Sequence, residues 1–171
     1  RISALAQSLD MPESSLGYTP LMAAVAERNT EMAVMLLRHG VATSPRSHRG
    51  QTVLHLVCHS QDMSPVLPLL LQASGLASPG RQLQAHSRQP QLAADLDSTD
   101  TGGQTALHYS CATDNAEAVR YLLAQGAHMN LRDQEGCTPL IRAAQAGSVE
   151  AVRCLLEAHL QCSEGVPAMV L

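Results

Sequence analysis

Gly103-Gln104-Thr105-Ala106-Leu107 is one copy of a motif, G-x-T-x-L, that occurs four times in the 171-residue chain. The other copies are Gly17-Tyr18-Thr19-Pro20-Leu21, Gly50-Gln51-Thr52-Val53-Leu54 and Gly136-Cys137-Thr138-Pro139-Leu140. Successive motif threonines are 33, 53 and 33 residues apart, so the period is 33, with about 20 additional residues between the second and third copies. Self-similarity at this period indicates a stack of repeated structural units.

Each copy carries the signals of two helices. The threonine can cap a first helix, and Pro20 and Pro139 occupy the first helical position, where a missing N–H does no harm. A Leu-Leu pair begins 17 residues after each threonine, and Ala or Val three residues before it completes the apolar stripe of a second helix. The motif glycine allows a turn with positive φ, which Asp100 and Asp133 can close through side-chain hydrogen bonds. The chain is therefore predicted to be all-α.

The four copies resemble the ankyrin repeat, a β-turn followed by two antiparallel helices. The T-P-L-H-x-A core of that family is matched most fully by Thr105-Ala106-Leu107-His108 and Thr52-Val53-Leu54-His55. The resemblance covers nearly all of residues 14–165 apart from the insertion. It implies an ankyrin-repeat solenoid of four stacked helix-turn-helix repeats with β-turn loops and one long insertion, in which the motif histidine is buried and hydrogen-bonded.

Several positions depart from the family pattern. Met22 and Ile141 replace the motif histidine in the outer copies. The glycine that usually ends the first helix and the later glycine of the last copy are replaced by Arg28, Gln61, Asp114 and His159. These departures concern the ends of the array and not its type.

The repeat boundaries predict a domain organisation. We expect repeats one and two in residues 14–79, a polar insertion loop in 80–99, and repeats three and four in 100–165. Residues 1–13 are interpreted as the end of a preceding repeat or an N-terminal cap, and 166–171 as a C-terminal tail or the start of further repeats. Because residue 1 is Arg, we interpret the chain as a fragment. The composition of the insertion favours a disordered loop, although long loops can also be functional.

Composition excludes several classes of protein. All 11 basic residues are Arg, so a P-loop lysine, a Schiff base and a lysine-rich nucleic-acid surface are impossible. The longest apolar run, around residues 66–71, is far shorter than the roughly 20 residues that a membrane span needs. The five cysteines are odd in number and have no CxxC spacing, which predicts free thiols in an intracellular compartment, the cytoplasm, the nucleus or both.

Two clusters contain residue types that can form chemical sites. His55, Cys58 and His59 have metal-ligand spacing, but they lack a second ligand pair, and His55 already has a structural role in the motif. His108 and Cys111 lie one helical turn apart, but Cys58 and Cys111 occupy the same repeat position, which indicates packing. We therefore predict no catalytic residue, no cofactor and no metal site.

Charge is distributed unevenly along the chain. Residues 1–94 contain seven Arg and five acids, whereas residues 95–171 contain four Arg and ten acids. Arg46 and Arg49 lie in an acid-free stretch that could bind an acidic peptide, although an ordinary solvated turn explains the same pattern. Direct nucleic-acid binding is not expected, because these arginines have no aromatic partners.

The resemblance implies a non-enzymatic scaffold or adaptor that binds a partner protein through turn tips and first-helix faces. The outward, variable positions of the family predict these partner-binding residues: Tyr18, Glu27, His48, Arg49, Gln51, His59, Gln104, Thr113, Gln134, Glu135 and Gln145. Two alternatives remain open. Leu96-Asp97-Ser98-Thr99-Asp100 before G-x-T-A-L-H is similar to inhibitors of nuclear factor kappa B, which suggests a transcription regulator. The array could also be the targeting module of a larger enzyme.

Overall fold

The computed structural model describes residues 15–73 and 96–163, and every regular element in these ranges is a helix. The helices form four pairs, as the repeat predicts: α2 (Pro20–Ala26) with α3 (Thr30–Arg38), α4 (Val53–His59) with α5 (Leu67–Ala73), α7 (Ala106–Ala112) with α8 (Ala116–Ala124), and α9 (Pro139–Ala146) with α10 (Val149–Ser163). A 3-10 helix, η1 (Gln61–Val66), precedes α5. The expectations for 1–13, for 166–171 and for most of the 80–99 insertion lie outside the described residues.

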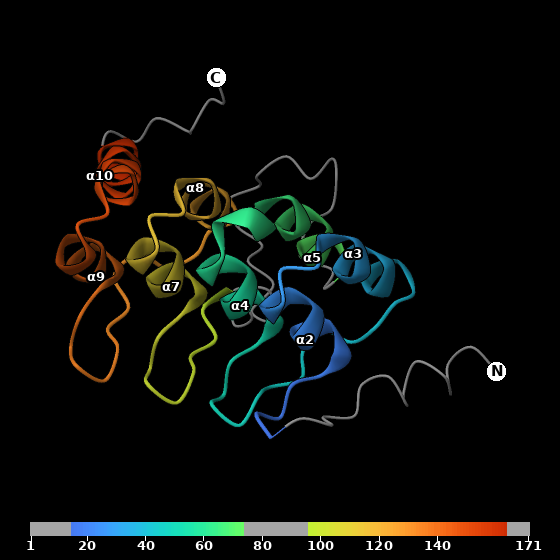
Figure 1. Ribbon diagram of the computed structural model, residues 1–171. Coiled ribbons are helices and arrows are strands. Elements are labelled where there is room, and N and C mark those ends of the chain that lie inside the picture. Colours follow the sequence, from blue (N-terminus) through green and yellow to red (C-terminus); the bar gives the residue numbers. More distant parts are fainter. Residues whose placement is uncertain (1–14, 74–95, 164–171) are drawn as a thin grey trace, which may run out of the picture.

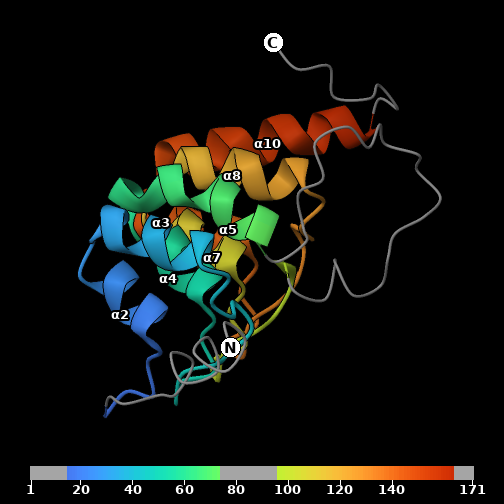
Figure 2. The same cartoon turned by 90° about the vertical axis from the view of Figure 1, so that its right-hand side faces the viewer.

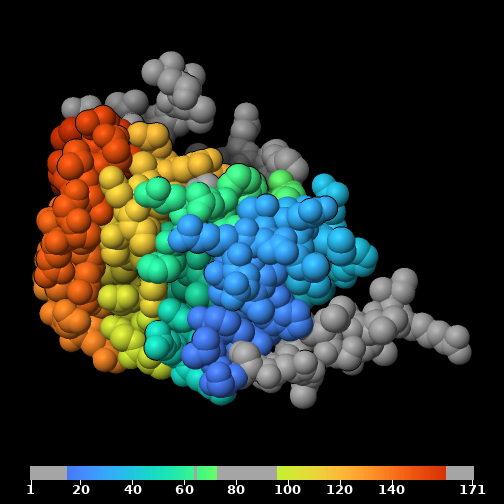
Figure 3. Space-filling view, in the orientation of Figure 1, coloured from blue at the N-terminus to red at the C-terminus, as the bar shows by residue number. Residues whose placement is uncertain are grey.

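The pairs are stacked in chain order. Figure 1 shows α2, α4, α7 and α9 in one row and α3, α5, α8 and α10 in a second row above them. The turns that precede α4, α7 and α9 project from the same edge of the first row. In the space-filling view the copies form consecutive layers from one end of the stack to the other (Figure 3). The expected all-helical ankyrin architecture is confirmed.

The motif threonines cap the first helices as predicted. The Thr19 hydroxyl accepts a hydrogen bond from Met22 N at 3.3 Å, and the Thr138 hydroxyl accepts one from Ile141 N at 3.4 Å. The prolines that follow these two threonines start α2 and α9. An N-cap of this kind contributes about 1 kcal/mol by satisfying an N–H that has no partner within the helix.

A short polar side chain closes the turn in each of the second, third and fourth copies. Asp100 Oδ1 accepts hydrogen bonds from Gly102 N and Gln104 N, both at 2.8 Å. Asp133 Oδ1 does the same for the next turn, and Ser47 Oγ takes the equivalent role one repeat earlier. The four motif glycines have φ between 69° and 76°, which confirms the predicted positive-φ turn.

Neighbouring turns are also joined to one another through the backbone. His48 N donates to Leu16 O at 3.0 Å, and Thr101 N donates to Arg49 O at 2.9 Å. Gln134 N donates to Gly102 O at 3.0 Å in the following turn. The row of turn tips is therefore a continuous hydrogen-bonded edge.

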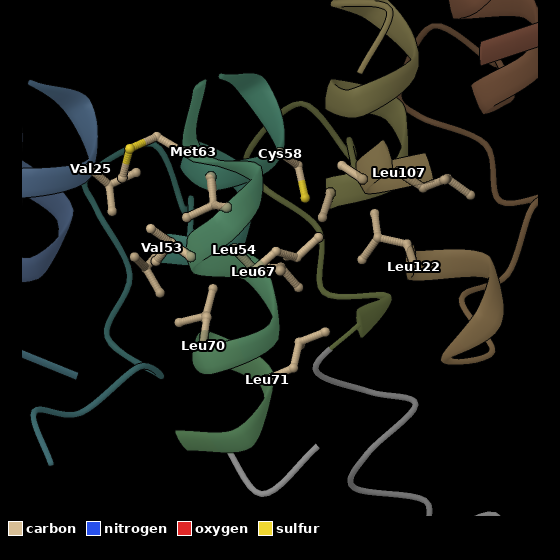
Figure 4. Packing of buried hydrophobic residues seen from close by; sticks show 14 of the residues in the cluster. Val25, Val53, Leu54, Cys58, Met63, Leu67, Leu70, Leu71, Leu107 and Leu122 are labelled. Carbon is tan, nitrogen blue, oxygen red and sulfur yellow. The ribbon is translucent and has the colours of Figure 1, made fainter. Parts of the chain in front are cut away.

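The core consists of aliphatic side chains and cysteines that meet between the two rows of helices. Figure 4 shows Val53 and Cys58 of α4 close to Leu67 and Leu70 of α5, with Leu107 of α7 on the adjoining side. Cys58 and Cys111 are fully buried, so the small residue of each first helix lets neighbouring pairs approach closely. This burial agrees with the packing interpretation of the position, and it raises the pKa of the Cys111 thiol to about 12.

The departures from the family pattern have local consequences. Arg28 and Asp114 adopt the left-handed conformation, with φ of 57° and 54°, where Gly147 has 74° in the last copy. Gln61 instead begins the 3-10 helix. Helices α3 and α8 are each followed by a positive-φ glycine, Gly40 or Gly126, whereas α10 continues through His159 to Ser163. Figure 2 shows α10 extending past α8 as a result.

Residues 96–99, which the sequence assigned to the insertion, are packed against the third repeat. Leu96 is 2% exposed and belongs to the core. Asp97 Oδ1 accepts a hydrogen bond from His128 N at 2.9 Å, and Asp97 Oδ2 contacts His128 Nδ1. The structured part of the third copy therefore begins at least four residues before Asp100.

Candidate protein-binding surface

Two buried histidines link one repeat to the next beneath the turn tips. His55 Nδ1 accepts from Thr52 N at 3.2 Å and lies 2.9 Å from the Thr52 hydroxyl, while His55 Nε2 lies 3.1 Å from Gln104 O. His108 repeats this arrangement with Thr105 N and with Cys137 O, at 3.2 and 3.1 Å. The carbonyl can only accept, so Nε2 carries a proton. Nδ1 accepts from a backbone N–H and therefore carries none, which makes each ring neutral.

Burial is the main physical cause of the electrostatics of these histidines. Each is 1% exposed. Desolvation holds the pKa of His55 below its ordinary value, against the opposing effects of its hydrogen bond to Gln104 and of the Asp100 charge. The pKa of His108 is lowered by desolvation in the same way. Because the neutral rings bridge successive repeats, the histidines fix the relative positions of the turns that display the surface.

An aromatic cluster that includes one of these histidines occupies the junction of the second and third repeats. The Tyr109 cluster consists of Gln51, His55, His59, Asp100 and Tyr109. The Tyr109 O–H donates to Asp100 Oδ2 at 2.8 Å and accepts from Gln51 Nε2 at 2.8 Å. The rings of His55 and His59 meet the Tyr109 ring edge to face, with centroids 5.6 and 5.7 Å away.

These contacts hold the Tyr109 side chain in a single position. Its ring is half-buried, so one part packs into the junction while the rest faces solvent. Desolvation, followed by the hydrogen bond to the Asp100 carboxylate, raises the pKa of Tyr109 to about 12. The hydroxyl is therefore neutral at physiological pH, and the Tyr109 side chain presents an uncharged aromatic surface.

Most of the predicted partner-binding residues face outward. The exposed ones are Glu27, His48, Arg49, His59, Gln134, Glu135 and Gln145, and the half-buried ones are Tyr18, Gln104 and Thr113. The prediction that Gln51 points outward is wrong. Gln51 is 6% exposed, because its amide turns inward to donate to Tyr109.

Several of the outward residues also make contacts within the scaffold itself. Gln134 Nε2 donates to Thr101 O of the preceding turn at 2.8 Å. The Thr113 hydroxyl donates to Tyr109 O at 3.1 Å within its own helix. Glu135 lies 3.1 Å from the Arg142 guanidinium, which also pairs with the buried Asp133 carboxylate at 2.6 Å. Substituting these residues would alter the scaffold as well as the surface.

The two arginines of the predicted acidic-peptide patch differ in their surroundings. Arg46 Nη1 donates to Gly50 O at 3.0 Å and to Thr99 O at 2.8 Å, which fastens its own turn to the next segment. Arg49 is exposed at a turn tip, and its charge acts on the Tyr109 hydroxyl. Of the two arginines, Arg49 is therefore the better placed to meet a ligand.

The structure separates the residues that resembled a metal site. His55 and Cys58 are buried in the packing between repeats, whereas His59 is exposed and lies against Tyr109. In residues 15–73 and 96–163, no group of three or more His, Cys, Asp or Glu side chains is arranged to hold a metal ion.

Sequence reasoning missed Tyr109 as a surface residue. The outward positions were assigned around the turn glycine and seven or eight residues after the threonine, whereas Tyr109 is four residues after it. That position is occupied by Ala23, Leu56, Tyr109 and Arg142 in the four copies. Both polar members reach back to the aspartate of their own turn, Tyr109 to Asp100 and Arg142 to Asp133. An Asp nine residues before Tyr or Arg is the signal that could have identified the pair.

Stacked helix pairs, joined by buried histidines and by hydrogen-bonded turn tips, define a helical repeat solenoid. No helix in the described part of the chain is long and apolar enough to cross a membrane. Comparison with known families agrees with the fold: a family model described as ankyrin repeats (3 copies) matches residues 81–164, and one described as ankyrin repeat matches residues 16–46.

Related proteins carry the same repeats. Human Inversin is 29% identical over 85% of this chain, and the mouse B-cell lymphoma 3 protein homolog is 31% identical over 84% of it. The human transient receptor potential cation channel subfamily A member 1 is 27% identical over 82%. The chain spans 15%, 29% and 11% of the lengths of these relatives, respectively. The chain belongs to the ankyrin-repeat family, whose repeats are generally non-enzymatic protein-interaction modules.

Proposed function

We propose that the chain is a non-enzymatic scaffold or adaptor that binds a partner protein through its turn tips and first-helix faces, with the Tyr109 cluster at the centre. The observation that carries this proposal is the half-buried Tyr109 ring, held by two hydrogen bonds and two histidine rings at the junction of the second and third repeats. A side chain that is already fixed loses little conformational entropy on binding. Tyrosine is also enriched among residues that dominate binding energy.

The charges around the cluster suggest what the partner presents. The exposed Arg49 and His48 lie on the turn of the second copy, and Glu135 on the turn of the fourth is paired with Arg142. We infer that an apolar side chain of the partner packs on Tyr109 and that an acidic residue lies next to Arg49. Because exposed charges are screened, Arg49→Glu should slow association and reduce its dependence on salt.

A site-specific photo-crosslinker tests the location of the surface. It would be placed at Gln104 or Thr101 on the turn tips and, as a control, at Arg120, an exposed residue of the second helix α8. We expect the same partner to be captured at both tip positions and not at residue 120. Equal capture at all three positions would contradict the proposed surface.

Alanine substitution tests the centre of the surface with the captured partner in purified form. Tyr109→Ala should weaken binding roughly 30-fold, equivalent to about 2 kcal/mol, since it removes the central aromatic contact. Tyr121→Ala is the matched control, because Tyr121 is a half-buried tyrosine on the second helix α8. If the two variants bind equally well, the partner does not use the Tyr109 cluster.

A second candidate is a transcription regulator similar to inhibitors of nuclear factor kappa B. It is favoured by the packed segment Leu96–Asp100, in which Leu96 enters the core and Asp97 holds His128 directly before the third repeat. This candidate is distinguished by testing whether a purified Rel-type domain competes with the captured partner for binding to the chain. Absence of binding to that domain at micromolar concentration would exclude it.

A further inference from the structure

The α9 and α10 pair ends the described stack with an apolar face. Leu140 and Ile141 are 37% and 41% exposed, whereas Leu107 and His108, which hold the same positions one repeat earlier, are each 1% exposed. In the earlier copies these positions are covered by the next helix pair, as the contacts of α7 with α9 show. Figure 1 shows no helix on the outer side of α9 and α10 among the described residues. The exposed face is thus the same surface that forms the inner junctions.

The prolonged helix α10 extends this face. Val149, Leu156 and Leu160 follow one another at spacings of seven and four residues, which places them on one side of the helix. Their exposed fractions are 65%, 49% and 59%. Together with Leu140 and Ile141 they form what we call the end face.

Two features of other repeat surfaces are missing from the end face. One is the polar character of a side that faces solvent, and the other is the glycine at which the chain turns toward the next repeat in the first and third copies. A repeat whose outer side faces solvent needs polar residues there, whereas this side of the fourth copy carries five large apolar residues. In the first and third copies the chain turns toward the next repeat at Gly40 and Gly126, but α10 has His159 there and continues as a helix. An exposed apolar patch on this scale indicates an interaction site.

Charges beside the stripe indicate its occupant. Glu150, Arg153 and Glu157 run along one flank of α10 with alternating sign, and Arg153 lies 3.3 Å from Glu150 within the helix. When two copies of one helix pack antiparallel about a two-fold axis, the same flank of each copy faces the other. With the axis near Leu155, Arg153 of each copy lies opposite Glu157 of the other. The stripe and its flank are therefore self-complementary.

We propose that the end face binds a second copy of the chain, so that two α10 helices pack antiparallel around Leu156 with Arg153 and Glu157 paired across the axis. Such an isologous contact closes on itself and gives a dimer. The dimer contact uses the same kind of packing as the junctions inside the stack, where neighbouring helix pairs cover one another through apolar residues. The turn tips and the Tyr109 cluster lie on other elements of each copy.

Sedimentation equilibrium of the purified chain from about 1 to 100 µM tests the proposal, and circular dichroism verifies the folding of each variant. The expected species has twice the 18.2 kDa mass of one chain. Leu156→Glu should weaken association at least tenfold. Met35→Glu is the matched control, since Met35 is also 49% exposed but lies on α3 at the other end of the stack; it should leave association unchanged.

A charge exchange tests the two-fold arrangement. Arg153→Glu should weaken the dimer, and the double variant with Arg153→Glu and Glu157→Arg should restore it. A chain that stays monomeric throughout the concentration range would overturn the proposal. It would also be overturned by masses that rise beyond the dimer, by a dimer that Leu156→Glu leaves intact, or by a double variant no better than Arg153→Glu alone.

Discussion

The first helices α7 and α9 begin with the same signals but present different surfaces. In α7, His108 is buried and donates to Cys137 O of the following repeat, whereas Ile141, at the same position of α9, is 41% exposed. Thr105 and Thr138 are the N-caps of the two helices, and both turns are closed by an aspartate. The difference shows that the surroundings of a repeat position depend on its neighbour: His108 is covered by the following repeat and bonds to its carbonyl, whereas no described helix pair covers Ile141.

Alanine substitution at this position should produce the largest contrast. His108→Ala leaves a cavity and removes the partners of Thr105 N and Cys137 O, so we expect a loss of roughly 3 kcal/mol in the free energy of unfolding. Ile141→Ala should cost less than about 1 kcal/mol, because the side chain is exposed in the monomer. Urea unfolding at a concentration where the chain is monomeric measures both. Equal losses would mean that His108 does not bridge the repeats.

The turn glycines provide a second contrast between the same two copies. Gly103 and Gly136 have φ of 74° and 76°, so alanine should cost each about 1–2 kcal/mol from the left-handed conformation alone. A Cβ at Gly103 would also lie 2.9 Å from Gln134 N, whereas a Cβ at Gly136 meets nothing within 4 Å. Gly103→Ala should therefore be the more destabilising by about 1 kcal/mol. Thermal unfolding of the two variants decides this, and a larger loss at Gly136 would contradict close contact between the turn tips.

The buried histidines predict that stability depends on pH. Their pKa is lowered on folding, so the unfolded chain binds more protons below the ordinary value of 6.5. Stability should be complete above that pH and fall as the pH decreases below it, by at most about 1.4 kcal/mol per pH unit for each histidine. Replacing His55 and His108 with Met, the residue that the first copy buries at position 22, should flatten this dependence between pH 7.5 and 5.5. An unchanged slope in urea unfolding would assign the effect to other groups.

The ends of the first helices should show the smallest effects. Arg28→Gly relieves a left-handed conformation and loses an exposed ion pair with Asp62, so we expect a net gain of about 0.5 kcal/mol. Asp114→Gly relieves the same conformation but removes the hydrogen bond that Ala151 N donates to Asp114 Oδ1 at 2.9 Å. A net loss of about 0.5 kcal/mol should follow. The opposite signs can be measured by differential scanning calorimetry, and a gain in both variants would mean that Asp114 does not cap α10.

The sequence was sufficient to predict the features that recur with the repeat. Threonine caps, positive-φ glycines and turn aspartates follow from local chemistry, so their spacing alone identifies the helix pairs. The position of Gln51 could not be predicted in this way, because its amide turns inward to meet Tyr109, 58 residues away. The missing family glycine marked Arg28, Gln61 and Asp114 alike, but it could not tell that Arg28 and Asp114 are left-handed whereas Gln61 begins a 3-10 helix.

Nitrogen-detected NMR of the imidazole rings tests most directly whether buried histidines join the repeats. Of the eight histidines in the chain, His55 and His108 should stay neutral well below pH 6.5 and carry the proton on Nε2, with slow exchange of that proton. The signals can be assigned by replacing each of the two with Met. If both rings titrated at their ordinary value, or carried the proton on Nδ1, the repeats would not be linked as described.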